Sequence, residues 1–314
     1  MVEFVKFKEK KNDEDDNSSK SPKRKPIITF KRVIWITIGV ILLSILISSC
    51  TVAVSPKIAI VPINGEITTA QSSSLFQVGS PSSRSVANQI YTLADDSTVK
   101  GIILDINSPG GSPVASDEIS QAISYATSQK PVYSVFSDLG ASGAYWIAVS
   151  SDKIYSAPLS IVGSIGVTSA MLSFEDFIEE WNITYRSQVA GEFKDMGSLF
   201  REPTDEEQKM IQELLDTVHQ EFINHIAGSR NLSVEEVTQL ATGEIFLGKD
   251  AIDLKLVDEI GYIRDVVDDM KNETGYNESL VMTYSPSIQR GGFFSINSPF
   301  DSFLPKNTAV IELK

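Results

Sequence analysis

The sequence predicts an α/β domain built on a mainly parallel sheet, and two observations support this prediction. Between residues 57 and 163, short runs rich in β-branched residues alternate with helical patterns, which is typical of βαβ units. The run "VKGIILDINS" at 99–108 is almost continuously apolar, as expected of a central strand covered on both faces. Because strands joined through helices return in the same direction, the sheet should be mainly parallel.

The expected elements follow in chain order up to the second half of the chain. The first strand, at 57–67, contains the turn signal Asn64-Gly65. We then expect a helix at 85–96, a strand at 99–111, a helix at 114–128, a strand at 131–138, an apolar helix after Ser142, and short strands at 153–158 and 163–170.

Past residue 203 the pattern becomes helical. Thr204 and Glu207 have the spacing of a capping box. An apolar stripe at helical spacing follows: Ile211, Leu215, Val218, Phe222 and Ile226. We expect the folded domain to span 57–285 and the remainder, 286–314, to be an irregular tail because it shows no clear periodicity.

The N-terminal part predicts a membrane anchor. Val33–Pro56 holds 24 residues without a charge, long enough to cross a bilayer, so we expect a transmembrane helix at 33–54. The preceding polar tail, 1–32, carries ten Lys and Arg against six Asp and Glu, which predicts a cytoplasmic N-terminus and a domain outside the membrane. A cleaved signal peptide, or lipidation at Cys50, remains the alternative.

Charge and cysteine content exclude several classes of protein. The net charge is −14 and the tail contributes +4, which leaves −18 on the rest; phosphate repulsion therefore argues against nucleic acid as a partner. Cys50 is the single cysteine, which excludes an intrachain disulfide framework and a cysteine-rich metal site. The sequence implies neither a metal nor an organic cofactor.

Ser142 is the candidate nucleophile. It lies in "GASGAYWIA" at 140–148, where small residues surround it and an apolar helix follows; it is either a helix cap or a nucleophile that a substrate approaches closely. The two histidines, His219 and His225, both lie in the amphipathic helix after 203, which makes a Ser-His-Asp triad improbable. Lysine is then the remaining base, and its pKa would have to fall to roughly 7–8.

Lys194 is the candidate base, in mixed surroundings. Phe193 and Met196 are apolar neighbours, but Glu192 and Asp195 lie close in sequence, and an ion pair with either carboxylate would disable the lysine. The S-x-x-K run Ser150–Lys153 lacks the companion motifs of penicillin-binding proteins. Phosphate-loop, dinucleotide-binding and H-E-x-x-H motifs are also absent from the sequence.

Five segments in this order resemble the bacterial signal peptide peptidase family. They are "NSPGGS" (107–112), "GASGAYWIA" (140–148), "VGSIGV" (162–167), "GEFKDMGS" (191–198) and "GEIFLGKDAIDLKLVDEIG" (243–261). The resemblance covers about 57–270 and implies the fold shared by Clp proteases and crotonases. The family motif reads A-S-G-G-Y where this chain has Ala144, which narrows the site by a methyl group.

The resemblance also implies roles for individual residues. Ser142 would be the nucleophile and Lys194 the general base, with Ser164 holding the lysine amine. Gly110 and Gly111 would donate backbone N–H groups to the oxyanion. Taken one at a time, these residues are also consistent with turns and caps.

As a whole, the resemblance implies a single-pass membrane serine endopeptidase that cuts peptides, remnant signal peptides among them, outside the cytoplasmic membrane. Short members of this family assemble into homo-oligomeric rings that share active sites between subunits. Two alternatives remain: an inactive peptide-binding or regulatory scaffold of the same fold, and an enzyme of the crotonase superfamily that acts on acyl thioesters.

Overall fold

The computed structural model describes residues 34–35, 37–43, 55–70, 82–285 and 309–310. The chain divides into two units, Met1–Ala53 and Val54–Lys314. In the first unit, residues 34–35 and 37–43 are helical. None of the helices within the described ranges combines the length and the apolar character that crossing a membrane requires. Much of the transmembrane helix predicted at 33–54 lies outside those ranges.

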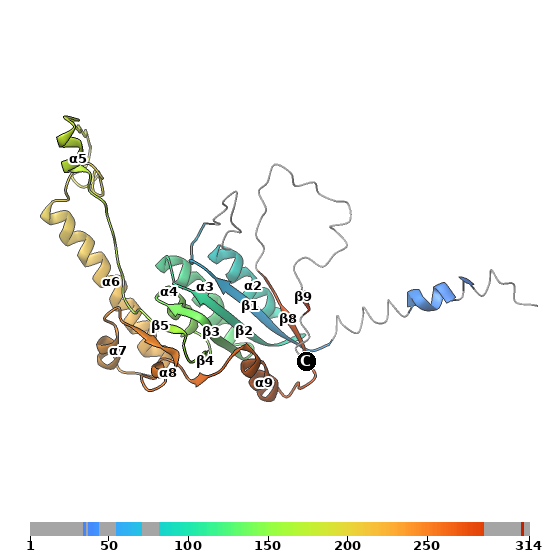
Figure 1. The fold of residues 1–314 in the computed structure, drawn as a ribbon. Helices are drawn as coiled ribbons and strands as arrows, with labels where there is room; N and C mark the ends of the chain where they lie inside the picture. The colour runs from blue at the N-terminus through green and yellow to red at the C-terminus, as the bar shows by residue number, and fades with distance from the viewer. Residues whose placement is uncertain (1–33, 36, 44–54, 71–81, 286–308, 311–314) are drawn as a thin grey trace, which may run out of the picture. The chain divides into compact units, whose positions relative to one another are not determined.

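The second unit is organised around one sheet with the strand order β6-β5-β3-β2-β1-β8-β9, and β4 and β7 continue from β3 (Figure 1). The pairs are parallel except β5–β6 and β8–β9, which confirms the mainly parallel sheet. The strands are β1 (Lys57–Asn64), β2 (Val99–Ser108), β3 (Val132–Ala141), β4 (Lys153–Ser156), β5 (Ile161–Gly163), β6 (Ile245–Leu247), β7 (Glu259–Ile260), β8 (Leu280–Thr283) and β9 (Ala309–Val310).

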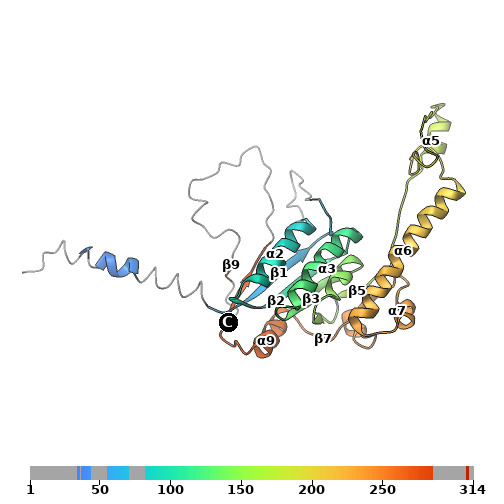
Figure 2. The same cartoon turned by 180° about the vertical axis from the view of Figure 1, so that it is seen from behind.

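Helices cover both faces of the sheet (Figures 1 and 2). Alternate residues of one strand point to opposite faces: Ala59 packs into the larger apolar cluster with α2, α3 and α4, whereas Ile58 and Ile60 pack with Val266 of α9. The helices are α2 (Ser83–Asp95), α3 (Pro113–Thr127), α4 (Gly143–Ala148), α5 (Glu175–Glu180), α6 (Asp205–Arg230), α7 (Val234–Leu240), α8 (Gly248–Ala251) and α9 (Ile263–Thr274).

Most of the predicted elements are present within a few residues of their expected bounds. The capping box of α6 is confirmed: the Thr204 hydroxyl accepts from the Glu207 N–H, and the Glu207 carboxylate accepts from the Thr204 N–H. The strand predicted at 163–170 is wrong, because regular structure ends at Gly163. Gly163 and Ser164 have φ values of 99° and 50°, which an extended strand does not accommodate. In the predicted tail, Ala309–Val310 form β9 against β8.

A long extension projects from this body. Residues 167–204 leave the sheet after β5, include α5, and return at the start of α6 (Figure 1). The buried apolar side chains of α6 lie in its C-terminal half, at Phe222, Ile223, Ile226 and Ala227. Helix α5 and the N-terminal half of α6 therefore stand away from the core.

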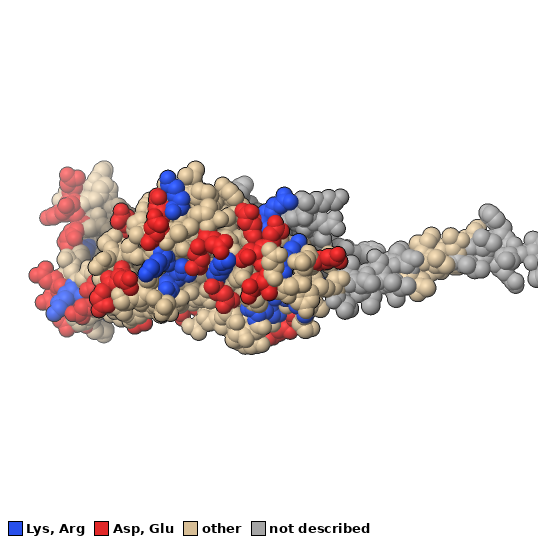
Figure 3. Space-filling view, turned by 90° about the horizontal axis from the view of Figure 1, so that it is seen from below, with Lys and Arg blue, Asp and Glu red and all other residues tan. Residues whose placement is uncertain are grey.

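Charged side chains of both signs are interspersed on the face that Figure 3 shows. Lys and Arg side chains lie among Asp and Glu, and the described part of this face presents no continuous basic patch. This distribution agrees with the acidic net charge and gives nucleic acid no evident docking surface on that face.

Candidate active site

Ser142 occupies the turn between β3 and α4 in a strained conformation. Its φ is 53° and its ψ is −124°, and backbone strain of this kind costs on the order of 1–3 kcal/mol. The turn is held on both sides, because the Ser142 N–H donates to the Gly163 carbonyl at 2.8 Å and the Ser142 carbonyl accepts from the Trp146 N–H at 3.0 Å. The turn therefore fixes the position of the Ser142 Cα and the direction of its Cα–Cβ bond.

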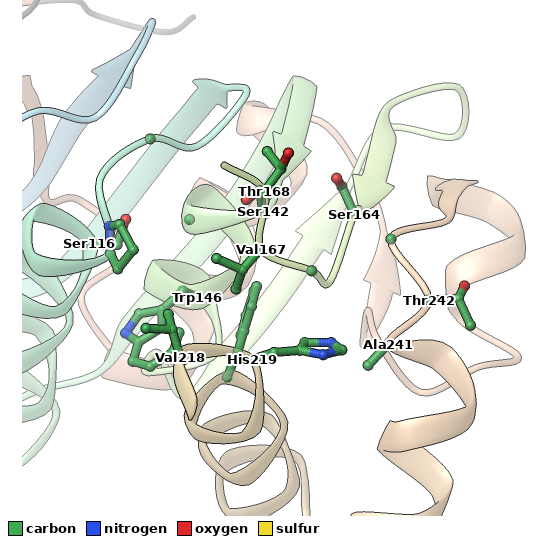
Figure 4. Close-up of a pocket in the computed structure, with 16 residues that line it drawn as sticks. Ser116, Ser142, Trp146, Ser164, Val167, Thr168, Val218, His219, Ala241 and Thr242 are labelled. Atoms are coloured by element: carbon green, nitrogen blue, oxygen red, sulfur yellow. The ribbon is translucent and has the colours of Figure 1, made fainter. Parts of the chain in front are cut away.

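The Ser142 hydroxyl does not cap α4. It lies instead among the residues that line a cavity of about 460 Å³ (Figure 4). The helix-cap interpretation of this serine is therefore wrong. A serine with a strained backbone, whose hydroxyl caps no helix and whose side chain lines a cavity, has the features expected of a nucleophile.

The cavity lies between α4, the chain after β5, and α6. Trp146, Val218 and Phe222 give it apolar walls, and Ser116, Ser142 and Ser164 contribute hydroxyl groups (Figure 4). The rings of Trp146 and Phe222 are tilted against each other with centroids 5.2 Å apart. An apolar cavity with a few polar groups suits an apolar group of a bound ligand.

The glycine turn at 110–111 packs directly on the serine turn. A Cβ at Gly110 would lie 2.5 Å from the Gly143 nitrogen and 2.9 Å from the Ser142 Cβ, and Gly110 has a φ of 94°. The position therefore requires glycine on two grounds, a close approach and a left-handed backbone. Gly111, from the same turn, lines the cavity.

The available backbone donors differ from the predicted pair. The Gly110 N–H already donates to the Ser108 hydroxyl at 3.1 Å. By contrast, the N–H groups of Gly111 and Gly143 donate to no acceptor in the described part of the chain. A Cβ at Gly143 would lie 3.2 Å from the Gly111 nitrogen, so the two donors are neighbours. The sequence prediction missed Gly143, although it directly follows the candidate nucleophile.

Ser164 also lines this cavity (Figure 4). Its φ is 50°, and its N–H donates to the Glu244 carbonyl at 2.7 Å. A second non-glycine residue with positive φ on the same cavity is a further sign of local strain at a functional site. The structure thus brings Ser142, Ser164, Gly110 and Gly111 together.

Lys194 lies elsewhere. It is exposed on the extension beyond β5 and is not among the residues that line the cavity. Within a single chain the structure therefore does not bring Lys194 to Ser142. Among the described residues, Lys194 forms no ion pair with Glu192, Asp195 or any other carboxylate.

The extension exposes many large apolar side chains. Trp181 is 67% exposed, and Leu172 is 70% exposed. The others include Met171, Phe174, Phe177, Ile183, Tyr185, Val189, Phe193, Leu199 and Phe200. A contiguous segment this rich in exposed apolar groups is typical of an interaction surface.

The two histidines have different surroundings. His225 is stacked on Trp146, and its Nε2 lies 3.1 Å from the Trp146 carbonyl oxygen; burial lowers the pKa of His225, as expected of a histidine inside the fold. His219 lines the cavity, and its Nε2 is buried without a hydrogen-bond partner in the described ranges. The sequence did not place His219 there, because the rotation of α6 about its axis depends on tertiary packing.

Comparison with known proteins places these residues in a wider context. The profile of peptidase family S49 matches residues 125–277, and that of Clp protease matches residues 71–162. A protein of Enterococcus faecium assigned as signal peptide peptidase SppA is 34% identical over 74% of this chain and 68% of its own length. A protein of Methanocaldococcus jannaschii assigned as a protease is 31% identical over 71% of this chain and 72% of its own. The chloroplastic serine protease SPPA of Arabidopsis thaliana is 29% identical over 65% of this chain and 30% of its own.

Proposed function

The chain belongs to peptidase family S49, and from this premise we propose that Ser142 is its nucleophile and Lys194, supplied by a neighbouring subunit, its general base. The observation that carries the proposal is the Ser142 turn. There the backbone of Ser142 is strained, its hydroxyl does not cap α4, and the residue lines a cavity with Gly111 and Gly143, whose N–H groups are free in the described part of the chain. The comparisons establish a serine peptidase; the dyad is the finer statement that we propose.

The geometry suggests the following reaction. The Ser142 Oγ attacks the carbonyl carbon of the scissile bond while its proton passes to the Lys194 amine. The oxyanion accepts hydrogen bonds from the Gly111 and Gly143 N–H groups, and losing one such donor typically costs about 10²–10³ in rate. The ammonium then protonates the leaving amine as the C–N bond breaks, and water hydrolyses the acyl-enzyme. Ser164, on the same cavity, would accept a hydrogen bond from the lysine.

Two observations favour a lysine from another subunit. Lys194 is exposed on the extension and is not among the residues that line the cavity of its own chain. The same extension exposes apolar side chains such as Leu172 and Trp181, which a second copy of this chain would cover. A head-to-tail contact of this kind closes into a ring when the rotation between neighbours allows it.

We propose peptides with apolar segments as substrates, signal peptides among them. The support is the cavity next to Ser142, whose walls are Trp146, Val218 and Phe222. An anchor at 33–54 would hold the domain at the outer face of the membrane, where cleaved signal peptides remain. Apolar peptides would then reach the cavity from the bilayer surface.

The proposal is tested by peptide cleavage with two single variants and two matched controls. Ser142→Ala and Lys194→Ala should each lower cleavage of an apolar peptide by about 10³-fold or more, because the first removes the attacking oxygen and the second removes the amine that accepts its proton. Ser124→Ala on α3 and Lys209→Ala on α6, both exposed, should cleave like the unaltered protein. Full cleavage by Ser142→Ala refutes the nucleophile. Peptide binding without cleavage by the unaltered protein would instead identify a scaffold.

A further inference from the structure

Arg201 uses all five of its N–H donors within the extension. Its Nε donates to the Asp195 carboxylate at 3.0 Å and its Nη2 to the Asp195 carbonyl at 2.9 Å. Nη1 and Nη2 also donate to the two carboxylate oxygens of Glu207 at 2.8 Å and 2.6 Å, and Nη1 donates to the Glu202 carbonyl at 3.0 Å. Arg201 therefore joins the Lys194 loop to the first turn of α6.

The far end of this network is rigid. Glu207 is only 2% exposed, and besides binding Arg201 it accepts the Thr204 N–H at 2.9 Å in the capping box of α6. A buried carboxylate is held in place by such bonds, because leaving one unpaired is costly. Arg201 is thus fixed on the α6 side and holds Asp195 from there.

Asp195 matters because it directly follows Lys194 in the chain. Its carboxylate accepts from Arg201 and from the Tyr185 hydroxyl, the latter at 2.8 Å. These bonds, with Arg201 contributing most, hold the pKa of Asp195 below its usual value, so the group is charged at any working pH. A carboxylate released beside an ammonium would stabilise the charged form of the lysine and disable it as a base.

We propose that Arg201 is a positioning residue that keeps the Asp195 carboxylate away from Lys194, so that the lysine is free to act as a base. This inference rests on the proposed role of Lys194. Glu192 and Asp195 lie within two positions of Lys194 in the chain, and Arg201 pairs with Asp195 and with Glu207 of α6. Of the two carboxylates in the loop, Asp195 is the one that Arg201 binds.

The test is the pH dependence of kcat/KM for peptide cleavage by the assembled full-length protein. Arg201→Met should move the acid limb of the kcat/KM profile to a higher pH by about one unit, which is close to a tenfold loss of kcat/KM at a given pH on that limb. Arg201→Lys should shift it the same way, because an ammonium cannot bridge both carboxylates as the guanidinium does. Adding Asp195→Asn to Arg201→Met should return the limb to its original position, which a merely structural role of Arg201 does not predict.

Arg201→Met also leaves Glu207 without its partner, so the comparison is repeated in a Glu207→Gln background that removes this buried charge. An unshifted acid limb in the Arg201→Met variants, or a shift that Asp195→Asn does not reverse, overturns the inference. Lys194→Ala separates the two proposals. An inactive Lys194→Ala beside an unshifted Arg201→Met refutes only the role of Arg201, whereas an active Lys194→Ala refutes the base and this inference with it.

Discussion

The strained backbone of Ser142 leads to a prediction about stability whose sign is unusual. We compare Ser142→Gly with Ser142→Ala, two variants that both lack the hydroxyl. At an ordinary position glycine is the less stable, by about 0.5–1 kcal/mol, because the unfolded chain has more freedom to lose. At Ser142, with φ 53° and ψ −124°, alanine instead keeps a backbone cost on the order of 1–3 kcal/mol that glycine avoids.

Taken at the middle of each range, the backbone cost at Ser142 exceeds the ordinary penalty of glycine by about 1 kcal/mol. Ser142→Gly should therefore be more stable than Ser142→Ala by about 1 kcal/mol, or roughly 2–4 °C in Tm for a domain of this size. The free energy of unfolding is measured by denaturant titration of both variants. Ser124, exposed on helix α3, serves as the matched control, where alanine should be more stable than glycine by about 1 kcal/mol. The same order at both positions would show that the Ser142 turn stores no strain.

Three further predictions follow from individual contacts. A Cβ at Gly143 would lie 2.4 Å from the Ser116 hydroxyl and 3.2 Å from the Gly111 nitrogen. Gly143→Ala should therefore shift the turn, misplace the two backbone donors and lower kcat by about 10²–10³. Adding Ser116→Ala relieves only the contact with the hydroxyl, so kcat should stay low; full recovery of kcat in the double variant would contradict a role of these donors. Arg201 lowers the pKa of Glu207 to about 2 from 4.5, so this carboxylate stabilises the fold above pH 4.5 and the stabilisation is lost as the pH falls from 4.5 towards 2. In Glu207→Gln the Tm should therefore depend less steeply on pH in that window. An unchanged slope of Tm against pH contradicts the assignment. The buried Tyr145 hydroxyl donates to a backbone carbonyl at 2.8 Å, and Tyr145→Phe should cost about 1–3 kcal/mol in denaturant unfolding; a cost near zero would show that the carbonyl finds another donor.

Local patterns predicted much of the fold and of the nucleophile turn. The β-branched runs and the helices between them define the sheet because each element buries one or both of its faces. Ser142 was recognisable from the small residues around it, and the glycine turn from Pro109-Gly110-Gly111. Both are short-range features that chain neighbours determine.

The remaining features depend on packing between distant segments. The Gly110 N–H is not free to bind an oxyanion because it donates to the Ser108 hydroxyl, and the sequence did not indicate this bond. His219 reaches the cavity because of how α6 is rotated, and Arg201 binds Asp195 and Glu207 only after the extension folds back onto the start of α6. The sequence also placed the Asp195 carboxylate beside Lys194, but it did not indicate that Arg201 binds this carboxylate.

Mixing two inactive variants tests the central claim most directly. Ser142→Ala and Lys194→Ala subunits are expressed together with different tags, the mixed assemblies are isolated, and peptide cleavage is measured. If each site takes its serine from one subunit and its lysine from the next, random mixing restores about a quarter of the sites in a head-to-tail ring. Isolated mixed assemblies that cleave no better than either variant alone would contradict a site shared between Ser142 and Lys194.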